Sequence, residues 1–421
     1  MKRIRSAIAL SDLHLGKKES YLYSKDANFQ NNRKALIDLL KKLGPQDEIV
    51  LLGDFLELSL AGLDEVYSDA KTFFALLAEA GPVRRIVYVP GNHDHHFWRS
   101  LAEQVHINGK IHDGQDPPCS ETYPYCFVDE RFSSKDKKLP CRIILEDLWP
   151  KKKKKPEFVV KYPHHLIEVV SEEGEKIYYL FTHGHFFEDL FKPINFLIEP
   201  AHLEELEAFN NGWLEFFDYH LGHAGKLSEE VKKVEKNFQE GDTKAKKTIR
   251  NVLKEIYKSL VQKLHLRCPW TCVLKCGIKL VQRWILKKTP MDKKSGLLGV
   301  PSIDDKLKRK IADYIENYIL KRYRKGKAED YYFPTDADIP KPFTLVFGHT
   351  HRPIRGEETS KAEVSVDGIT YPLAKTGGWI STDGTGAANG ENAGILLIDK
   401  KGARWETLEG QLQKRSIVEK D

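Results

Sequence analysis

The 421-residue chain contains few cysteines and no long uncharged apolar run. Six cysteines are too few for the disulfide framework on which small secreted domains depend. No stretch of ~18 uncharged apolar residues is present, so we expect no helix that spans a membrane. The basic start of the chain, Met1 to Arg5, leads into an apolar stretch that is too short for a signal peptide, and we therefore expect a cytoplasmic protein.

The sequence also lacks a phosphate-binding loop, because its glycine-rich stretch at residues 383–394 has no Gly-Lys-Ser or Gly-Lys-Thr ending. Its charge is unevenly distributed. The net charge is +6, yet residues 226–330 hold 28 Lys and Arg against 13 Asp and Glu, a surplus of +15 that leaves −9 for the rest. This pattern indicates a basic module set into an acidic body.

Strands and helices alternate near the start of the chain. Apolar runs and helical spacing predict strands at 4–10, 48–52 and 85–89 and helices at 28–43 and 70–80. This alternation indicates an α/β fold with a largely parallel sheet. Asp12, Asp54 and Asn92 each follow a predicted strand, at the sheet edge where α/β proteins gather functional residues.

A long helical segment interrupts the predicted strands. Strand-like runs occur on both sides of it, at 158–170, 176–181, 344–347, 370–374, 394–398 and 403–407. Because the sheet resumes after the helices, the pattern is typical of an insertion into a domain and not of a second domain in tandem. We therefore divide the chain into a first core part (1–190), a helical insertion that acts as a cap or lid (191–339) and a second core part (340–421).

Five short clusters are rich in histidine and aspartate, and four of them directly follow a predicted strand. They are Asp12-Leu13-His14, Gly53-Asp54, Gly91-Asn92-His93-Asp94, His183-Gly184-His185 and Gly348-His349-Thr350-His351. A carboxylate can bridge two divalent cations while imidazole and amide oxygen fill other positions. Such ligation without thiolate favours manganese, with iron and zinc as the alternatives, over calcium. A metal pair of this kind promotes phosphoryl transfer to water.

The motifs and their order resemble the calcineurin-like metallophosphoesterase superfamily over residues 1–190 and 340–410. The resemblance implies a metal-dependent phosphoesterase with a four-layer α/β fold, in which two packed mixed β-sheets are flanked by helices, and the large helical insertion lies outside it. It also implies two groups of metal ligands with one bridge: Asp12, His14 and His351 for the first metal, Asn92, His183 and His349 for the second, and Asp54 between them.

The same resemblance implies roles for residues beside the ligands. His93 would be an unligated acid that protonates the leaving oxygen or stabilises the transition state, and Asp94 would orient it. Glu57 stands where many family members carry an aspartate, and we expect it to lie behind the ligands. His95 and His96 exceed the ligand set, and either of them could contact the substrate.

The metal ligands do not identify the class of substrate, but the sequence of the insertion gives information about it. Residues 269–288 form an amphipathic pattern with Trp270 and Trp284 on the apolar stripe and basic residues elsewhere. A helix packed on the core with a solvated basic face would show this pattern, and so would an interfacial helix that makes a peripheral contact with an anionic membrane. The arrangement is similar to the UDP-2,3-diacylglucosamine pyrophosphohydrolases, which implies a lipid-linked phosphodiester or pyrophosphate, although those enzymes commonly carry arginine at the position of His93.

Other functions stay open at this point. Nucleic acid is the second choice of substrate, because the basic segment 226–330 could contact phosphates, and the protein would then be a nuclease. A phosphoprotein phosphatase is a further alternative within the superfamily. A catalytically dead binding protein on the same fold is the alternative outside the enzymes, and the complete ligand set argues against it.

Overall fold

The computed structural model describes most of the predicted core and short parts of the insertion. The described residues are 2–26, 29–116, 127–129, 144–188, 191–192, 195, 203–220, 223, 303–320, 339–351, 353–354, 362–380 and 392–408, with isolated residues between 254 and 279. The amphipathic segment 269–288 lies outside them except at 271, 275–277 and 279, where Lys275 and Lys279 are exposed.

The described strands form two sheets. The seven-stranded sheet contains, in spatial order, β13 (Gly402–Thr407), β12 (Gly394–Asp399), β2 (Ser6–Leu10), β3 (Gln46–Leu52), β4 (Val83–Val89), β6 (Glu157–Tyr162) and β5 (Phe127–Asp129). The six-stranded sheet contains β1 (Lys2–Ile4), β7 (His165–Val170), β8 (Lys176–Thr182), β9 (Thr344–Phe347), β11 (Ile369–Lys375) and β10 (Glu363–Val366). Both are mixed, since β2, β3, β4 and β6 are parallel while β12 is antiparallel to β2, and β9 is parallel to β8 while β7 is antiparallel to it.

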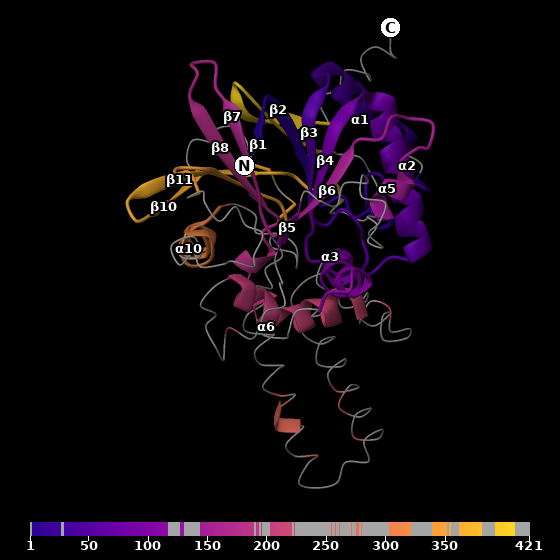
Figure 1. The fold of residues 1–421 in the computed structure, drawn as a ribbon, viewed down its shortest axis with the longest axis vertical. Coiled ribbons are helices and arrows are strands. Elements are labelled where there is room, and N and C mark those ends of the chain that lie inside the picture. The colour runs from indigo at the N-terminus through magenta and orange to yellow at the C-terminus, as the bar shows by residue number, and fades with distance from the viewer. Residues whose placement is uncertain are drawn as a thin grey trace.

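The helices of the described residues lie outside the sheets or in the insertion. They are α1 (Phe29–Leu43), α2 (Leu63–Ala80), α3 (His95–Glu103), η1 (Gln104–Gly109), α4 (Lys110–His112), α5 (Ile144–Leu148), η2 (His185–Phe187), α6 (Leu203–Glu215), η5 (Phe216–His220), α10 (Asp305–Tyr314) and η6 (Ile315–Leu320). Figure 1 shows α1, α2 and α5 beside the seven-stranded sheet, and α10 near β10 of the other sheet. The predicted α/β fold of two mixed sheets flanked by helices is confirmed. The boundaries of the insertion stay a prediction, although its described elements are helical.

Alternation along the strands builds two apolar layers. In β2, Ala7 and Ala9 pack between the two sheets, in a cluster with Ile167 and Val346 from the six-stranded sheet. Ile8, between them in sequence, belongs to the larger cluster beneath the helices. This arrangement follows from the two-residue period of a strand that is buried on both faces.

Two of the strand predictions are wrong in extent. The run predicted at 4–10 is divided between β1 and β2, which belong to different sheets, and the run predicted at 158–170 is divided between β6 and β7 in the same way. In the second run, Pro163 separates the two strands, and proline has no N–H group to continue the ladder. An apolar run therefore does not reveal where the chain passes from one sheet to the other.

Helix α2 begins seven residues before the predicted start. It begins at Leu63 after Gly62, and Asp64 and Glu65 occupy its first turn. Acidic residues there interact favourably with the positive end of the helix dipole, so these polar residues belong to the helix although they add nothing to its apolar stripe.

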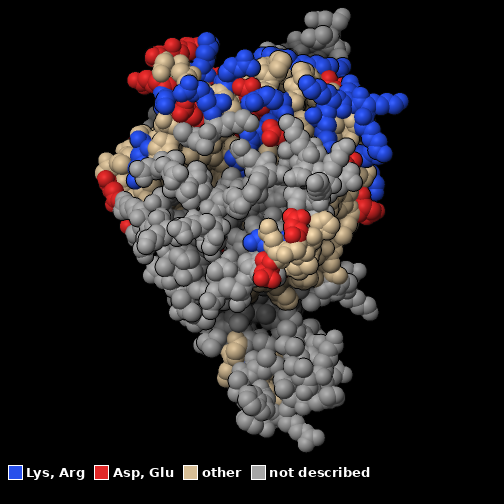
Figure 2. Space-filling view, viewed as in Figure 1, with Lys and Arg blue, Asp and Glu red and all other residues tan. Residues whose placement is uncertain are grey.

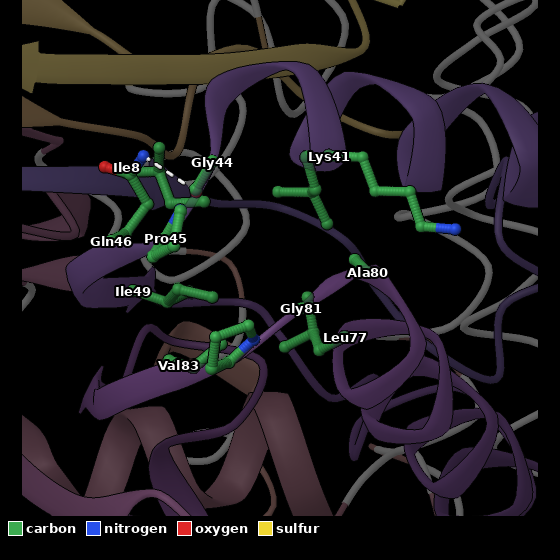
Figure 3. Close-up of a pocket in the computed structure, with 12 residues that line it drawn as sticks. Ile8, Lys41, Gly44, Pro45, Gln46, Ile49, Leu77, Ala80, Gly81 and Val83 are labelled. Atoms are coloured by element: carbon green, nitrogen blue, oxygen red, sulfur yellow. Dashed lines mark hydrogen bonds between the residues drawn. The ribbon is translucent and has the colours of Figure 1, made fainter.

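A pocket of about 150 Å³ lies at the edge of the sheet where β3 and β4 start, between these strands and the ends of α1 and α2. It is lined by residues such as Ile8, Ile49, Leu77 and Val83 (Figure 3). None of its lining residues is acidic or a histidine. The predicted ligands Asp54 and Asn92 follow the opposite ends of β3 and β4.

Basic side chains gather over the end of the molecule that carries α1 and α2, as Figure 2 shows. The basic run 151–155, which precedes β6, is exposed along its whole length. Within the described residues, no helix has the length and apolar character needed to cross a membrane.

Candidate metal centre

The predicted motifs meet at the carboxyl ends of parallel strands. Each motif follows a strand: Asp12 follows β2, Asp54 follows β3, Asn92 follows β4, His183 follows β8 and His349 follows β9. Hydrogen bonds join these loops to one another. The Asp12 N–H donates to the Gly53 carbonyl at 3.0 Å, and the Gly348 N–H donates to the His183 carbonyl at 3.1 Å. The loops therefore support each other's conformation before any ligand is considered.

Five of the seven predicted ligands have a left-handed backbone. Their φ angles are 54° for Asp12, 45° for His14, 49° for Asp54, 66° for His349 and 53° for His351. Among the described non-glycine residues, Asp367 alone shares this property. A left-handed conformation costs about 1–3 kcal/mol at such residues and persists where the surrounding structure enforces it, which is common at functional sites.

Asp12, His14 and His351 form one group of potential ligands, with donor atoms within 4.8 Å of one another. His351 Nε2 lies 3.3 Å from Asp12 Oδ1 and 3.3 Å from His14 Nε2. The other oxygen of Asp12, Oδ2, accepts the backbone N–H of His349 at 3.0 Å. Burial alone would raise the pKa of Asp12, but His351 lowers it below its usual value. The carboxylate is therefore ionised and has one oxygen directed at the two imidazoles.

Asp54, His183 and His349 form a second group. His183 Nε2 lies 3.2 Å from Asp54 Oδ2 and 3.3 Å from His349 Nδ1. The other ring nitrogen of His183, Nδ1, lies 3.0 Å from the Leu52 carbonyl, which fixes the ring. Burial opposes protonation of His183, but Asp54 raises its pKa to about 9. The buried Asp54 carboxylate therefore favours positive charge at this position.

The Asp54 carboxylate lies between the two groups. Its Oδ1 accepts the backbone N–H of His93 at 2.9 Å, while Oδ2 lies 3.2 Å from His183 Nε2 and 3.8 Å from His14 Nε2. Gly91 passes so close that an added Cβ would collide with Asp54 Oδ1 and would lie 2.7 Å from the Asp54 nitrogen. Asp54 is thus held from one side and presents a single oxygen towards both groups of histidines.

Several predicted ligands have a buried atom that makes no hydrogen bond and that a divalent cation could bind. Within the described residues these atoms are Asp12 Oδ1, Asp54 Oδ2, Asn92 Oδ1 and His349 Nε2. Leaving a buried polar group without a partner costs about 1–3 kcal/mol, and more for a charged group. Two buried carboxylates with mixed imidazole and amide donors fit divalent transition metals, and the donor set contains no thiolate.

Glu57 lies behind the first group, where it contacts two histidines. Its Oε2 lies 2.8 Å from His14 Nδ1, and its Oε1 lies 2.8 Å from His93 Nδ1. Burial favours the neutral acid, but His93 and His14 lower the pKa of Glu57 well below its usual value. Burial also lowers the pKa of His14 to about 4. A carboxylate that accepts from Nδ1 leaves the Nε2 lone pair of His14 directed away, as a metal ligand requires.

Asp94 makes a different set of contacts from the one predicted. Its carboxylate accepts the backbone N–H groups of Phe55 and Gly91 at 2.8 Å and 2.5 Å, and it contacts the Tyr88 hydroxyl. Burial and the neighbouring Asp54 raise its pKa to about 6. These bonds fix the loop that carries Asn92 and His93. The His93 ring instead lies against Glu57 and Ser59, so these contacts favour Glu57 over Asp94 as its orienting group.

Three further residues lie near the second group and were not assigned from the sequence. His185 is buried, neither of its ring nitrogens has a hydrogen bond, and its ring centre is 5.7 Å from that of His183. Glu188 Oε1 lies 3.5 Å from His349 Nε2. Phe191 packs edge-on against His349 at 5.3 Å between ring centres. The sequence signal for His185 was its position two residues after the predicted ligand His183. No sequence pattern indicated Glu188 or Phe191.

This combination of two mixed sheets and a buried cluster of aspartates and histidines defines a metal-binding hydrolase. A family model described as calcineurin-like phosphoesterase matches residues 6–234, which is more than half of the chain. The chain belongs to this family and is a metal-dependent phosphoric ester hydrolase. No curated protein matches the chain as a relative.

Proposed function

We propose that the protein is a two-metal phosphoesterase that hydrolyses a phosphodiester or pyrophosphate bond. The observation that carries the proposal is the position of Asp54, whose Oδ2 lies within 3.8 Å of histidines from both groups while Oδ1 is fixed by a backbone N–H. Asp12, His14 and His351 would hold one metal, and Asn92, His183 and His349 the other. Manganese is our first choice, with iron and zinc as alternatives.

A bound metal pair would supply a nucleophile at neutral pH and would neutralise charge on the phosphoryl group. The residues of the chain orient and hold this arrangement. The backbone N–H groups of His93 and His349 each fix one oxygen of an aspartate, so that the second oxygen of that aspartate is available. Glu57 and the Leu52 carbonyl hold the rings of His14 and His183.

His93 would donate the proton that the leaving oxygen requires. Its ring is 6% exposed and is held through Nδ1 by Glu57 at 2.8 Å and by Ser59 at 2.7 Å. Glu57 binds both His93 and His14, so it connects the proposed acid to a proposed metal ligand through one side chain. A positioned acid of this kind contributes about 10²- to 10⁴-fold to the rate.

The substrate that we propose is lipid-linked. The insertion begins directly after the His183 loop, where Phe186, Phe187 and Phe191 are buried, and it ends just before His349. Both of its ends are thus anchored at the site, as expected of a cap over a substrate with an apolar part. The amphipathic segment 269–288 supports a peripheral contact of this cytoplasmic protein with an anionic membrane.

A nuclease is the second candidate, because residues 226–330 carry a surplus of +15. A manganese-supplemented assay with bis-p-nitrophenyl phosphate, its monoester, oligonucleotides, phosphopeptides and lipid pyrophosphates separates the candidates. Preference for lipid pyrophosphates supports the first, preference for oligonucleotides supports the nuclease, and preference for phosphopeptides supports a phosphoprotein phosphatase. A purified chain that binds metal but hydrolyses none of these would support a binding protein on the same fold.

The two-metal centre is tested by Asp54→Asn. Wild-type protein should contain about two transition metals per chain, and the variant should lose activity and at least one metal, since both positions use Asp54. Asp367→Asn is the matched control, because Asp367 is also an aspartate with a left-handed backbone but lies in an exposed turn between β10 and β11. Full activity in metal-free wild-type protein, or normal metal content in Asp54→Asn, would contradict the proposal.

A further inference from the structure

His95 is held between two glutamates that belong to the insertion. It is the first residue of α3, it is buried, and it follows the loop Gly91–Asp94 directly. Its Nε2 lies 2.7 Å from Glu207 Oε1, and its Nδ1 lies 2.7 Å from Glu215 Oε1. Both glutamates are on α6, between β8 and β9. An imidazole that donates through both nitrogens carries two protons, so the geometry makes His95 a cation between two carboxylates.

The surroundings of His95 satisfy the remaining atoms of both carboxylates. The second oxygen of Glu207, which is fully buried, accepts the Tyr162 hydroxyl of β6 at 2.8 Å. The second oxygen of Glu215 lies 2.7 Å from His96 Nδ1. Burial would lower the pKa of His95, but the two glutamates raise it to about 9, which agrees with the geometry. A charged group this deeply buried is stable only while its partners are in place.

The contact also reaches the loop that carries the proposed catalytic groups. The backbone N–H of His95 lies 3.4 Å from the Asn92 carbonyl, and the Phe97 N–H donates to the Asp94 carbonyl at 3.0 Å. The loop is therefore continuous with the first turn of α3. Its other contacts come from the core, through Asp94 and the Asp54 carboxylate. His95 and His96 both join this turn to the insertion through Glu215, and His95 alone of the two also contacts Glu207.

We infer that the Glu207–His95–Glu215 contact is a clamp through which the helical insertion positions the loop Gly91–Asp94, so that His95 is a positioning residue for hydrolysis. The kinetic part of this inference rests on the proposed function. The clamp differs from a substrate contact, because both ring nitrogens of His95 are occupied by the glutamates. If the contacts with Glu207 and Glu215 are removed, His95 loses both partners and the loop loses one of its anchors. Misplacement of catalytic groups by about 1 Å costs on the order of 10²-fold in rate.

The test compares His95→Gln and Glu207→Leu with wild type in the full-length, manganese-loaded protein. Bis-p-nitrophenyl phosphate is the substrate, because it is small and has no apolar part for the insertion to cover. For both variants, we expect kcat to fall at least tenfold while KM stays within about twofold, since a positioning residue does not touch the substrate. Glu207→Gln can still accept a hydrogen bond from His95, so its kcat should fall less than that of Glu207→Leu.

Two matched controls separate the clamp from general packing. His96→Gln removes the neighbouring histidine, whose side chain is 32% exposed, lies 2.7 Å from Glu215 and stacks on Tyr219. These contacts hold the His96 ring against the insertion and away from a role in binding substrate, and the variant removes them without touching the contacts of His95. Tyr162→Phe removes the hydroxyl from Glu207 but leaves His95 between its carboxylates. Both should keep kcat within about threefold of wild type. If His95→Gln does not fold, Glu215→Gln replaces it, because Glu215 is partly exposed and its substitution leaves Glu207 in place.

Hydrogen exchange provides a readout that does not depend on activity. In His95→Gln, the amides of residues 91–94 and 203–215 should exchange at least tenfold faster than in wild type, and in His96→Gln they should not. Unchanged exchange at 91–94 together with a wild-type kcat in His95→Gln would overturn the clamp. If wild-type protein hydrolyses no phosphoester, the proposed function fails, and the exchange experiment still decides whether the clamp exists.

Discussion

Replacing His93 by alanine separates proton donation from metal binding. The backbone N–H of His93, which holds Asp54 Oδ1 at 2.9 Å, is retained in the variant, whereas the ring that contacts Glu57 and Ser59 is lost. Asp54 therefore keeps its orientation, and His14 keeps its own bond to Glu57 at 2.8 Å. We expect His93→Ala to bind both metals and to lose only the contribution that the His93 ring makes to the rate of hydrolysis.

The expected loss is that of a positioned acid, about 10²- to 10⁴-fold in kcat. At 1.36 kcal/mol for each factor of ten, this corresponds to about 2.7–5.4 kcal/mol of transition-state stabilisation. The loss should depend on the leaving group. A p-nitrophenolate ion departs without a proton, so the variant should be impaired least with p-nitrophenyl esters and most with alkyl esters.

The assay is a series of diesters whose leaving groups span several units of pKa, with metal content measured on the same samples. Wild type should show a shallow dependence of log kcat on leaving-group pKa, and His93→Ala a steep one. His96→Ala is the control, because it removes a nearby histidine that contacts Glu215 and not Glu57. An equal loss for all leaving groups, or loss of metal in His93→Ala, would refute the assignment.

Three other predictions concern the close packing at Gly91, a buried charge cluster and the insertion. Gly91→Ala should lower kcat/KM at least 10²-fold because its Cβ would displace Asp54, whereas Gly212→Ala, with open space around it in α6, should be neutral in the same assay. Glu48 contacts Arg85 and His165, and Arg85 is buried at 0% exposure. Glu48→Ala removes the carboxylate from both, so it should lower the free energy of unfolding by about 3–5 kcal/mol in urea titrations. Burial opposes ionisation of Glu48, but His165 and Arg85 lower its pKa to about 2. The contribution of Glu48 to the free energy of unfolding should therefore be present above pH 4.5 and lost as the pH falls towards 2. The double variant Trp284→Ala, Lys279→Glu should no longer float with anionic vesicles at low salt, yet it should still hydrolyse a soluble diester. If wild-type protein does not float with these vesicles, residues 269–288 do not bind the membrane and the alternative of packing on the core is supported.

Much of the site could be predicted from the sequence because each ligand motif is short and follows an apolar strand. The structure places Asp12, His14 and His351 together, and likewise Asp54, His183 and His349, although His14 and His351 are 337 positions apart in the chain. Such proximity cannot be derived from spacing. The grouping was implied by the resemblance of the whole ordered set of motifs to the calcineurin-like superfamily.

The supporting contacts could not be predicted, because they depend on side-chain direction. Asp94 follows His93 directly, yet its carboxylate points to the backbone of Phe55 and Gly91. Glu57 is far from His93 in sequence but reaches both His93 and His14. Sequence position identifies a neighbour along the chain, whereas the hydrogen bonds identify the neighbour in space.

The backbone conformation of the ligands could not be predicted from the sequence either, and it affects how strongly the site binds metal. Asp12, His14 and Asp54 all adopt positive φ, at an expected cost of about 1–3 kcal/mol each. The conformation is maintained by hydrogen bonds between the loops, since the His14 N–H donates to the Asp54 carbonyl at 2.9 Å and the Trp379 N–H donates to the Asp12 carbonyl at 3.0 Å. The folding of the two sheets therefore supplies the energy that orders the ligands. A cation that enters this site does not have to order them, so more of its interaction energy is retained as affinity.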